Sequence, residues 1–334
     1  PGITGTSVPN SRSAPEIKDF LLDVVDEIWG DKGTWKMPYK GGDQSFFGVG
    51  VPYITFATGY TPEELERLNW AFLSPWLHTE ADTLDKVDKE LYDRHLHFFA
   101  TLVLRLCNSE PIPYDLSQPV ALLMSHLEAL KEMASGIDGL DLDGLITKTG
   151  RLATAVEALP RTEQAGQKER RFINEASIKA SREISFLWTE ADKYDQDPYG
   201  YSLIGKPVPR LYVPITRLVE LEPGSQEFNL WMTKFIRERN RVSDAISKAR
   251  DSLAWATLFL KECTQGTEAQ RGLLFEVVTP ALCTGRVRCY RAAKAIKSPL
   301  RTSCLLVPQS SSGVGGKNVW KTVGSSGWLG TGRE

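Results

Sequence analysis

Apolar side chains recur every three or four residues along much of the chain, and this spacing predicts amphipathic helices. The clearest early case begins near Ser13, which has capping-box spacing with Glu16, while Pro15 suits a first helical turn. Gly30 is a natural stop for this helix. The expected buried face consists of Ile17, Phe20, Leu21, Val24, Val25 and Ile28.

A short apolar run with a different pattern follows. Residues 51–57 read Val-Pro-Tyr-Ile-Thr-Phe-Ala, which is rich in β-branched and aromatic residues and apolar on both faces, as in a buried strand. A shorter strand is expected near residues 35–39, and Thr61 starts a short helix that reaches about Trp70. A helix followed by a buried strand is the unit of an α/β layer, so the first part of the chain is predicted to have that fold.

Helical periodicity then dominates. Asp82 or Thr83 is expected to cap a long helix that ends before Pro111, with a buried stripe of Leu84, Val87, Leu91, Phe98, Leu102, Val103 and Leu106. Further helices are predicted at residues 116–133, 142–159, 163–191 and 225–262. Residues 195–222 contain four prolines and are expected to form an extended surface loop. The pattern therefore predicts an all-α part after the α/β part.

Composition is that of an ordinary globular chain, with 41% hydrophobic and 25% charged residues. The net charge of −2 gives no pull toward nucleic acid or an anionic membrane. No apolar run approaches the roughly 18 residues of a membrane span. The five cysteines are odd in number, and no pair has the Cys-x2-Cys spacing of a structural zinc site, so the thiols indicate no compartment.

Charge and periodicity both change at residue 264. Residues 264–334 hold ten Lys/Arg and three Asp/Glu, a net of +7, which leaves 30 basic and 39 acidic residues before them, a net of −9. Two explanations of this Gly/Ser-rich segment stay open: a flexible tail, and sequence translated from a non-coding or shifted frame. The chain also opens without Met or a signal pattern, so a processed chain or a fragment is expected.

Two polar motifs carry the candidate chemistry. One reads His-Thr-x-x-Asp-Thr-x-Asp-x-Val-Asp from His78 to Asp88, and the other reads Gly-Asp-Gln-x-x-Phe-x-x-Gly-Val-Pro from Gly42 to Pro52. A neutral imidazole in a loop ahead of a capped helix is a frequent zinc ligand, although a lone loop histidine is more often simply solvated. Two motifs in this order, joined by a buried strand, are more specific than either alone.

Together the motifs resemble the closing part of an M28-type zinc exopeptidase domain. Relatives have the final zinc-ligand motif and a Ser-Asp-His-x-x-Phe-x-x-x-Gly-Ile-Pro segment, one residue longer than its counterpart here. The resemblance implies the C-terminal portion of a three-layer α/β peptidase domain, followed by a helical dimerisation domain as in glutamate carboxypeptidase-like relatives. It also implies two zinc ions that share a water, with a glutamate as general base. The family supplies its ligands in the order His, Asp, Glu-Glu, Asp, His, and His78 corresponds to the last.

Departures from the family pattern limit what the resemblance implies. No other ligand of the series is found, so the chain offers one ligand where a catalytic zinc takes three, and it is expected to be inactive alone. Leu77 stands where many relatives have a Tyr that stabilises the oxyanion, and Gln44 replaces a common His. Asp43 is expected either to orient the substrate pocket or to support the glycine-rich turn. Asp82 fits a helix cap better than a residue behind the metal ligands.

The predicted organisation is a peptidase part at residues 1–108, a helical dimerisation part at 109–263 and the tail at 264–334. The resemblance implies hydrolysis of a peptide substrate near a chain end, a homodimer through the helical part, and an extracellular or secretory location. The alternative is a non-catalytic, transferrin-receptor-like binding protein, which Leu77 favours. A third reading is a helical interaction protein in which the zinc motif is a relic.

Overall fold

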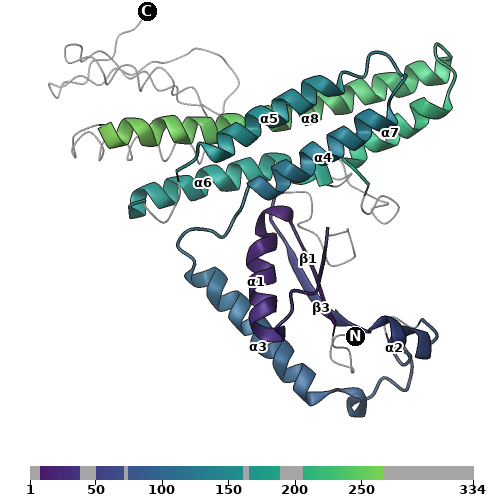
Figure 1. Ribbon diagram of the computed structural model, residues 1–334, viewed down its shortest axis with the longest axis vertical. Coiled ribbons are helices and arrows are strands. Elements are labelled where there is room, and N and C mark those ends of the chain that lie inside the picture. Colours follow the sequence, from purple (N-terminus) through teal and green to yellow (C-terminus); the bar gives the residue numbers. More distant parts are fainter. Residues whose placement is uncertain (1–7, 38–49, 71–73, 161–164, 189–205, 266–334) are drawn as a thin grey trace, which may run out of the picture. The chain divides into compact units, whose positions relative to one another are not determined.

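The computed structural model describes residues 8–37, 50–70, 74–160, 165–188 and 206–265 (Figure 1). Residues 1–265 form one compact unit and residues 266–334 a second, and only the first contains described residues. The expected tail, from residue 266 on, therefore lies outside them. The described part combines a three-stranded mixed sheet with eight α-helices. At this level, the predicted class of an α/β part followed by helices is confirmed.

Three short strands form the sheet in the order β2-β1-β3. The central strand β1 (Val8–Ser13) runs parallel to β2 (Thr34–Lys36) and antiparallel to β3 (Ile54–Gly59). Helix α1 (Lys18–Trp29) connects β1 to β2 and provides the crossover that parallel strands require. Ser11 of β1 is paired with Trp35 of β2 on one side and with Phe56 of β3 on the other. Directly paired residues share one face of a sheet, so Trp35 and Phe56 lie on the same face.

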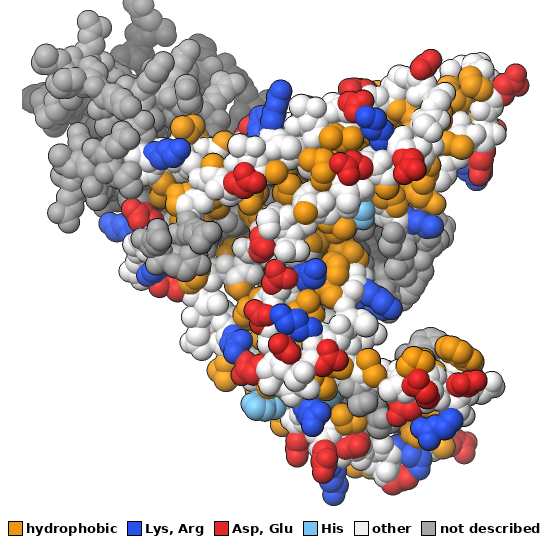
Figure 2. All heavy atoms as spheres, viewed as in Figure 1, with side chains coloured by type: hydrophobic (Ala, Val, Ile, Leu, Met, Phe, Trp, Pro, Cys, Tyr) orange, Lys and Arg blue, Asp and Glu red, His pale blue; other side chains and the backbone are white. Residues whose placement is uncertain are grey.

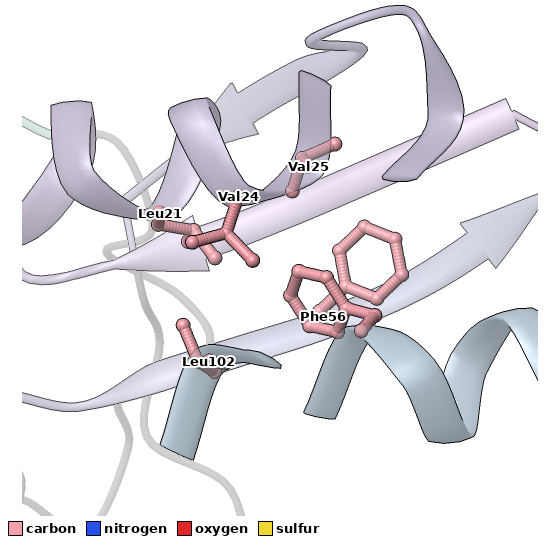
Figure 3. Packing of buried hydrophobic residues seen from close by; sticks show 6 residues of the cluster. Leu21, Val24, Val25, Phe56 and Leu102 are labelled. Carbon is pink, nitrogen blue, oxygen red and sulfur yellow. The ribbon is translucent and has the colours of Figure 1, made fainter. Parts of the chain in front are cut away.

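The core of the α/β part lies where the sheet meets α1 and α3 (Lys89–Asn108). Its buried side chains, most of them labelled in Figure 3, are Leu21, Val24, Val25, Phe56, Phe98 and Leu102. The rings of Phe56 and Phe98 lie 4.2 Å apart between their centroids, and Trp29 lies 4.7 Å from Phe56. Aromatic contacts therefore link β3 to both helices.

The start of the first helix differs from the expected capping box. Ser13 is the last residue of β1, and its hydroxyl accepts a hydrogen bond from Trp35 Nε1 at 3.0 Å. A 3₁₀ turn, η1 (Pro15–Ile17), follows, and α1 begins only at Lys18. The predicted cap is wrong because strand pairing draws Ser13 into the sheet. Gly30 ends the helix in the left-handed conformation, with φ of 70°, as predicted.

Two other short elements follow the predictions more closely. The strand expected at residues 51–57 forms three residues further on, as β3. Helix α2 (Pro62–Arg67) begins after Thr61 with a full capping box: the Thr61 hydroxyl accepts from the Glu64 amide, and the Glu64 carboxylate accepts from the Thr61 amide. It ends before the expected Trp70, which has a positive φ.

Neither Asp82 nor Thr83 caps α3. A separate 3₁₀ turn, η2 (Leu84–Lys86), follows Thr83, and the chain is extended again before the long helix begins. Asp88 is the N-cap residue, and its carboxylate accepts a hydrogen bond from the Leu91 amide at 3.0 Å. The expectation that Asp82 or Thr83 caps this helix is therefore wrong.

Replacing Asp88 with Ala is expected to lower the free energy of unfolding by about 1 kcal/mol, because α3 loses the side-chain acceptor at its first turn. Asp82→Ala removes an exposed carboxylate from the same segment and is expected to change that free energy by less than about 0.5 kcal/mol. Urea unfolding of both variants measures the difference. Equal losses would show that Asp88 is not the cap.

The helical part comprises α4 (Ser117–Met133), α5 (Leu142–Glu157), α6 (Gln167–Ile184), the 3₁₀ turn η4 (Ser185–Trp188), α7 (Pro209–Glu220) and α8 (Gln226–Gln265). Helix α8 has 40 residues and packs against α5, α6 and α7 (Figure 1). Its fully buried positions recur at helical spacing: Phe235, Val242, Ile246, Ala249, Leu253 and Ala256. The helices predicted at 116–133, 142–159, 163–191 and 225–262 are confirmed, with shifted ends.

Helix α7 forms where an extended loop was expected. Pro209 occupies its first turn, where the missing N–H costs nothing, but Pro214 lies inside the helix. Leu211, Ile215 and Leu218 are buried at spacings of four and three, and α7 packs on α8. Burial of this stripe offsets the cost of about 3 kcal/mol that an interior proline carries.

Positive and negative side chains are mixed on the face of the described part that Figure 2 shows. In the view of Figure 2, Lys and Arg are interspersed with Asp and Glu, and no large area carries one sign. Among the described helices, none combines the length and the apolar content needed to cross a bilayer.

Candidate functional site

The candidate ligand His78 lies in a turn between the sheet and the longest helix of the α/β part. The chain leaves β3 at Gly59, forms α2, and makes a series of turns over residues 75–81 before η2 and α3. The placement is the one predicted, in a loop ahead of α3. His78 itself is exposed.

Hydrogen bonds from Thr79 hold this turn together. Its amide and its hydroxyl both donate to the carbonyl of Trp76, at 3.0 and 2.6 Å. Its hydroxyl accepts from the Ala81 amide at 3.2 Å, and its carbonyl accepts from the Asp82 amide at the same distance. The Thr-x-x-Asp part of the motif therefore has a local structural role, which is to fix the backbone on either side of His78.

The backbone around His78 is unusual. Six non-glycine residues of the described part have a positive φ, and four of them, Asn69, Trp70, Ser74 and His78, lie in the loop between α2 and η2. The φ of His78 is 65°, in the left-handed region that costs side-chain-bearing residues energy. Backbone outliers that persist in a folded protein cluster at functional sites. The loop is therefore the strongest candidate site among the described residues.

The remaining residues of the predicted site are not brought together with His78 by any described contact. Leu77 is half-buried and has no hydrogen-bond donor in its side chain. Asp82 is exposed, and its amide rather than its carboxylate takes part in the turn. Asp43 and Gln44 lie outside the described residues.

The described residues do not by themselves fit a catalytic zinc. Such an ion takes three protein ligands, whereas within the described residues no group of three or more His, Cys, Asp or Glu side chains is placed to hold a metal. His78 remains a single exposed imidazole. No catalytic step through a metal can be built on these residues alone.

The strongest local electrostatic effect of the loop falls on Asp85. Its carboxylate accepts hydrogen bonds from the Lys86 ammonium and the Thr83 hydroxyl. The Lys86 bond, followed by that of Thr83, lowers the pKa of Asp85 to about 2. Lys86 also lies 6.0 Å from the centre of the Trp76 ring. Lys86 therefore connects η2 to the turn through Trp76, and Asp85 pairs with it as an anion.

The other described histidines have structural surroundings. His95 is buried in the core of the α/β part, with Nε2 at 3.1 Å from Thr58 Oγ1 and its ring 5.4 Å from Trp29. His97 is exposed, so the two point to different sides of α3 as predicted. His126 packs edge-on against Trp188 at 5.9 Å, and burial lowers the pKa of His126.

Sequence reasoning missed Glu16, which it assigned to a capping box. The side chain is buried, with 5% exposed, and its carboxylate accepts a hydrogen bond from Ser181 on α6. Burial raises the pKa of Glu16, against the smaller opposing effect of the Ser181 bond. Burial, and then the nearby Glu16 charge, raise the pKa of Tyr114 to about 12. A glutamate one residue after a proline gives no signal of such burial.

No family model matches the chain, and no match is found among the curated proteins.

Proposed function

We propose that this chain is the C-terminal portion of an M28-type zinc exopeptidase, whose reaction is the hydrolysis of a peptide bond near a chain end. In this proposal, residues 1–108 complete the α/β catalytic domain and His78 is its last zinc ligand. The other ligands and the general base would come from polypeptide outside these residues. A chain that supplies one ligand is expected to be inactive alone.

The observation that carries the proposal is the conformation of the His78 turn. His78 is exposed and has a positive φ, in a turn between α2 and η2 that hydrogen bonds from Thr79 close. These bonds fix the backbone from which the His78 side chain projects, and metal affinity depends on such support by the residues around a ligand. Leu77 offers no donor to an oxyanion, so that role would fall to another residue.

The test compares two histidines in a polypeptide that contains the whole catalytic domain. His78→Ala is expected to lower peptidase activity by at least the ~10–100-fold that follows loss of a residue supporting a metal ligand. His97→Ala, an exposed histidine of α3, is the matched control and is expected to leave activity within about twofold. Substrate peptides with free and blocked ends separate amino- from carboxypeptidase action.

A non-catalytic, transferrin-receptor-like binding protein is the second candidate, and Leu77 favours it. Because Leu77 has no hydroxyl at the position directly before His78, the contribution to oxyanion stabilisation that a Tyr makes there in relatives would be missing. If a folded polypeptide that contains the whole domain, with His78 and His97 both unchanged, hydrolyses no peptide, this candidate is supported and the first is contradicted.

A further inference from the structure

Glu16 lies where the α/β part meets the helical part. It belongs to η1, just ahead of α1, and its side chain is buried against α6, where the Ser181 hydroxyl donates to Oε1. Its backbone carbonyl accepts a hydrogen bond from the Asp115 amide at 2.8 Å, in the segment between α3 and α4. One residue therefore bonds to two segments that are 99 and 165 positions away in the sequence.

No cation compensates this carboxylate within the described residues. None of their ion pairs includes Glu16, and the nearby Lys18 ammonium lies over the Trp35 ring at 5.0 Å. The start of α4, residues 116–124, has no ionisable side chain. Burying an unpaired charge costs several kcal/mol, so the neutral acid is favoured in this position.

Few titratable groups face Glu16 from the elements packed around it. From the segment before α4 these are the Tyr114 phenol, which interacts with the Glu16 charge, and Asp115, whose carboxylate accepts from Ser117. The α6 group that contacts Glu16 is the hydroxyl of Ser181, which carries no charge. Lys179 and Glu183 lie two positions from Ser181 and so point to other sides of α6, as does the exposed Arg182. The α1 neighbour Asp19 accepts from Gln118.

We propose that Glu16 is a proton-dependent contact that regulates how firmly the helical part docks on the α/β part: the neutral carboxyl stays buried against Ser181, and its ionisation opens the contact. This inference does not depend on the peptidase proposal. It concerns only the packing of η1, α4 and α6.

The sign of the pH dependence follows from which state, docked or opened, binds the Glu16 proton more tightly. Burial raises the pKa of docked Glu16 above its usual 4.5, whereas in an opened contact the pKa returns toward that value. Docking is therefore strongest below about pH 4.5 and weakens as the pH rises through the raised pKa. One proton limits the change in the opening equilibrium to about tenfold per pH unit.

Hydrogen exchange of the full chain between about pH 5 and pH 8 measures this opening, once the chemical exchange rate is corrected for. Amides of residues 110–120 and 175–185 are expected to open more often as the pH rises, by up to about tenfold per unit over part of the range. Glu16→Gln stays neutral and keeps an acceptor for Ser181, so its opening is expected to be independent of pH. Glu27→Gln, an exposed acid of α1, is expected to behave as the wild type does.

A Glu16→Gln variant with the same pH dependence as the wild type would overturn the proposal. Ser181→Ala gives a second test that does not depend on the first variant folding. Since the Ser181 bond lowers the pKa of docked Glu16, its removal is expected to extend the pH-dependent rise in opening to higher pH before it levels off, while the rise still begins near the pKa of the opened state. A Ser181→Ala profile that superimposes on the wild type would equally contradict the assignment.

Discussion

Phe98→Ala is expected to lower the free energy of unfolding by about 3–5 kcal/mol, because it leaves a cavity that the core cannot close. The Phe98 side chain is fully buried, and its ring lies 4.2 Å from Phe56 and 5.6 Å from Trp29. Those contacts join α3 to β3 and to α1, so one substitution weakens every layer of the α/β part. Urea or thermal unfolding measures the loss.

The adjacent Phe99 is the matched control for this prediction. It is 44% exposed, and its truncation to Ala is expected to cost no more than about 1 kcal/mol. If Phe98→Ala and Phe99→Ala lowered the free energy of unfolding by similar amounts, the face of α3 that packs on the core would not be the one that contains Phe98.

Glu238→Ala is expected to lower the free energy of unfolding by about 3–5 kcal/mol, because it removes the carboxylate that pairs with the largely buried Arg210 guanidinium. Arg210 on α7 and Glu238 on α8 form an ion pair at 3.1 Å, with side chains only 6% and 12% exposed. The guanidinium also lies 5.5 Å from the centre of the Phe186 ring, in an environment with little water to solvate it.

Two further variants isolate the electrostatic cause. The double substitution Arg210→Met with Glu238→Leu removes both charges and is expected to be neutral or to stabilise the protein by about 1–4 kcal/mol. Glu220→Ala breaks an exposed pair with Arg217 and is expected to cost less than about 1 kcal/mol. If Glu238→Ala cost no more than Glu220→Ala, the Arg210–Glu238 pair would be solvated rather than buried.

Helices with strong apolar periodicity could be predicted from the sequence, and those without it could not. The predicted helix at 225–262 matches α8, because packing and periodicity agree along its length. Strand β1, by contrast, reads Val-Pro-Asn-Ser-Arg-Ser and has almost no β propensity of its own. It forms because β2 and β3 pair with it on both sides, which no local pattern reveals. In α7, prolines obscured a buried stripe.

In the candidate site too, some features could be predicted from the local sequence, and others depend on the surrounding fold. Its position could be predicted from the motif, which places His78 before α3, whereas the positive φ of His78 depends on the turn that Thr79 closes. Asp82, Asp85 and Asp88 lie at equal spacing, so the sequence alone does not say which one caps the helix. The extended backbone before Asp88 decides it. Burial of Glu16 depends on α6, far away in the sequence.

We propose His78 as the last ligand of a two-zinc site, so the zinc content of the protein is expected to depend on this residue. In a purified polypeptide that contains the whole catalytic domain, about two zinc ions per chain are expected. His78→Ala is expected to lose at least one of them, while His97→Ala keeps both. A folded wild-type polypeptide with zinc content near zero, or a His78→Ala variant that retains full zinc, would show that His78 is not a zinc ligand.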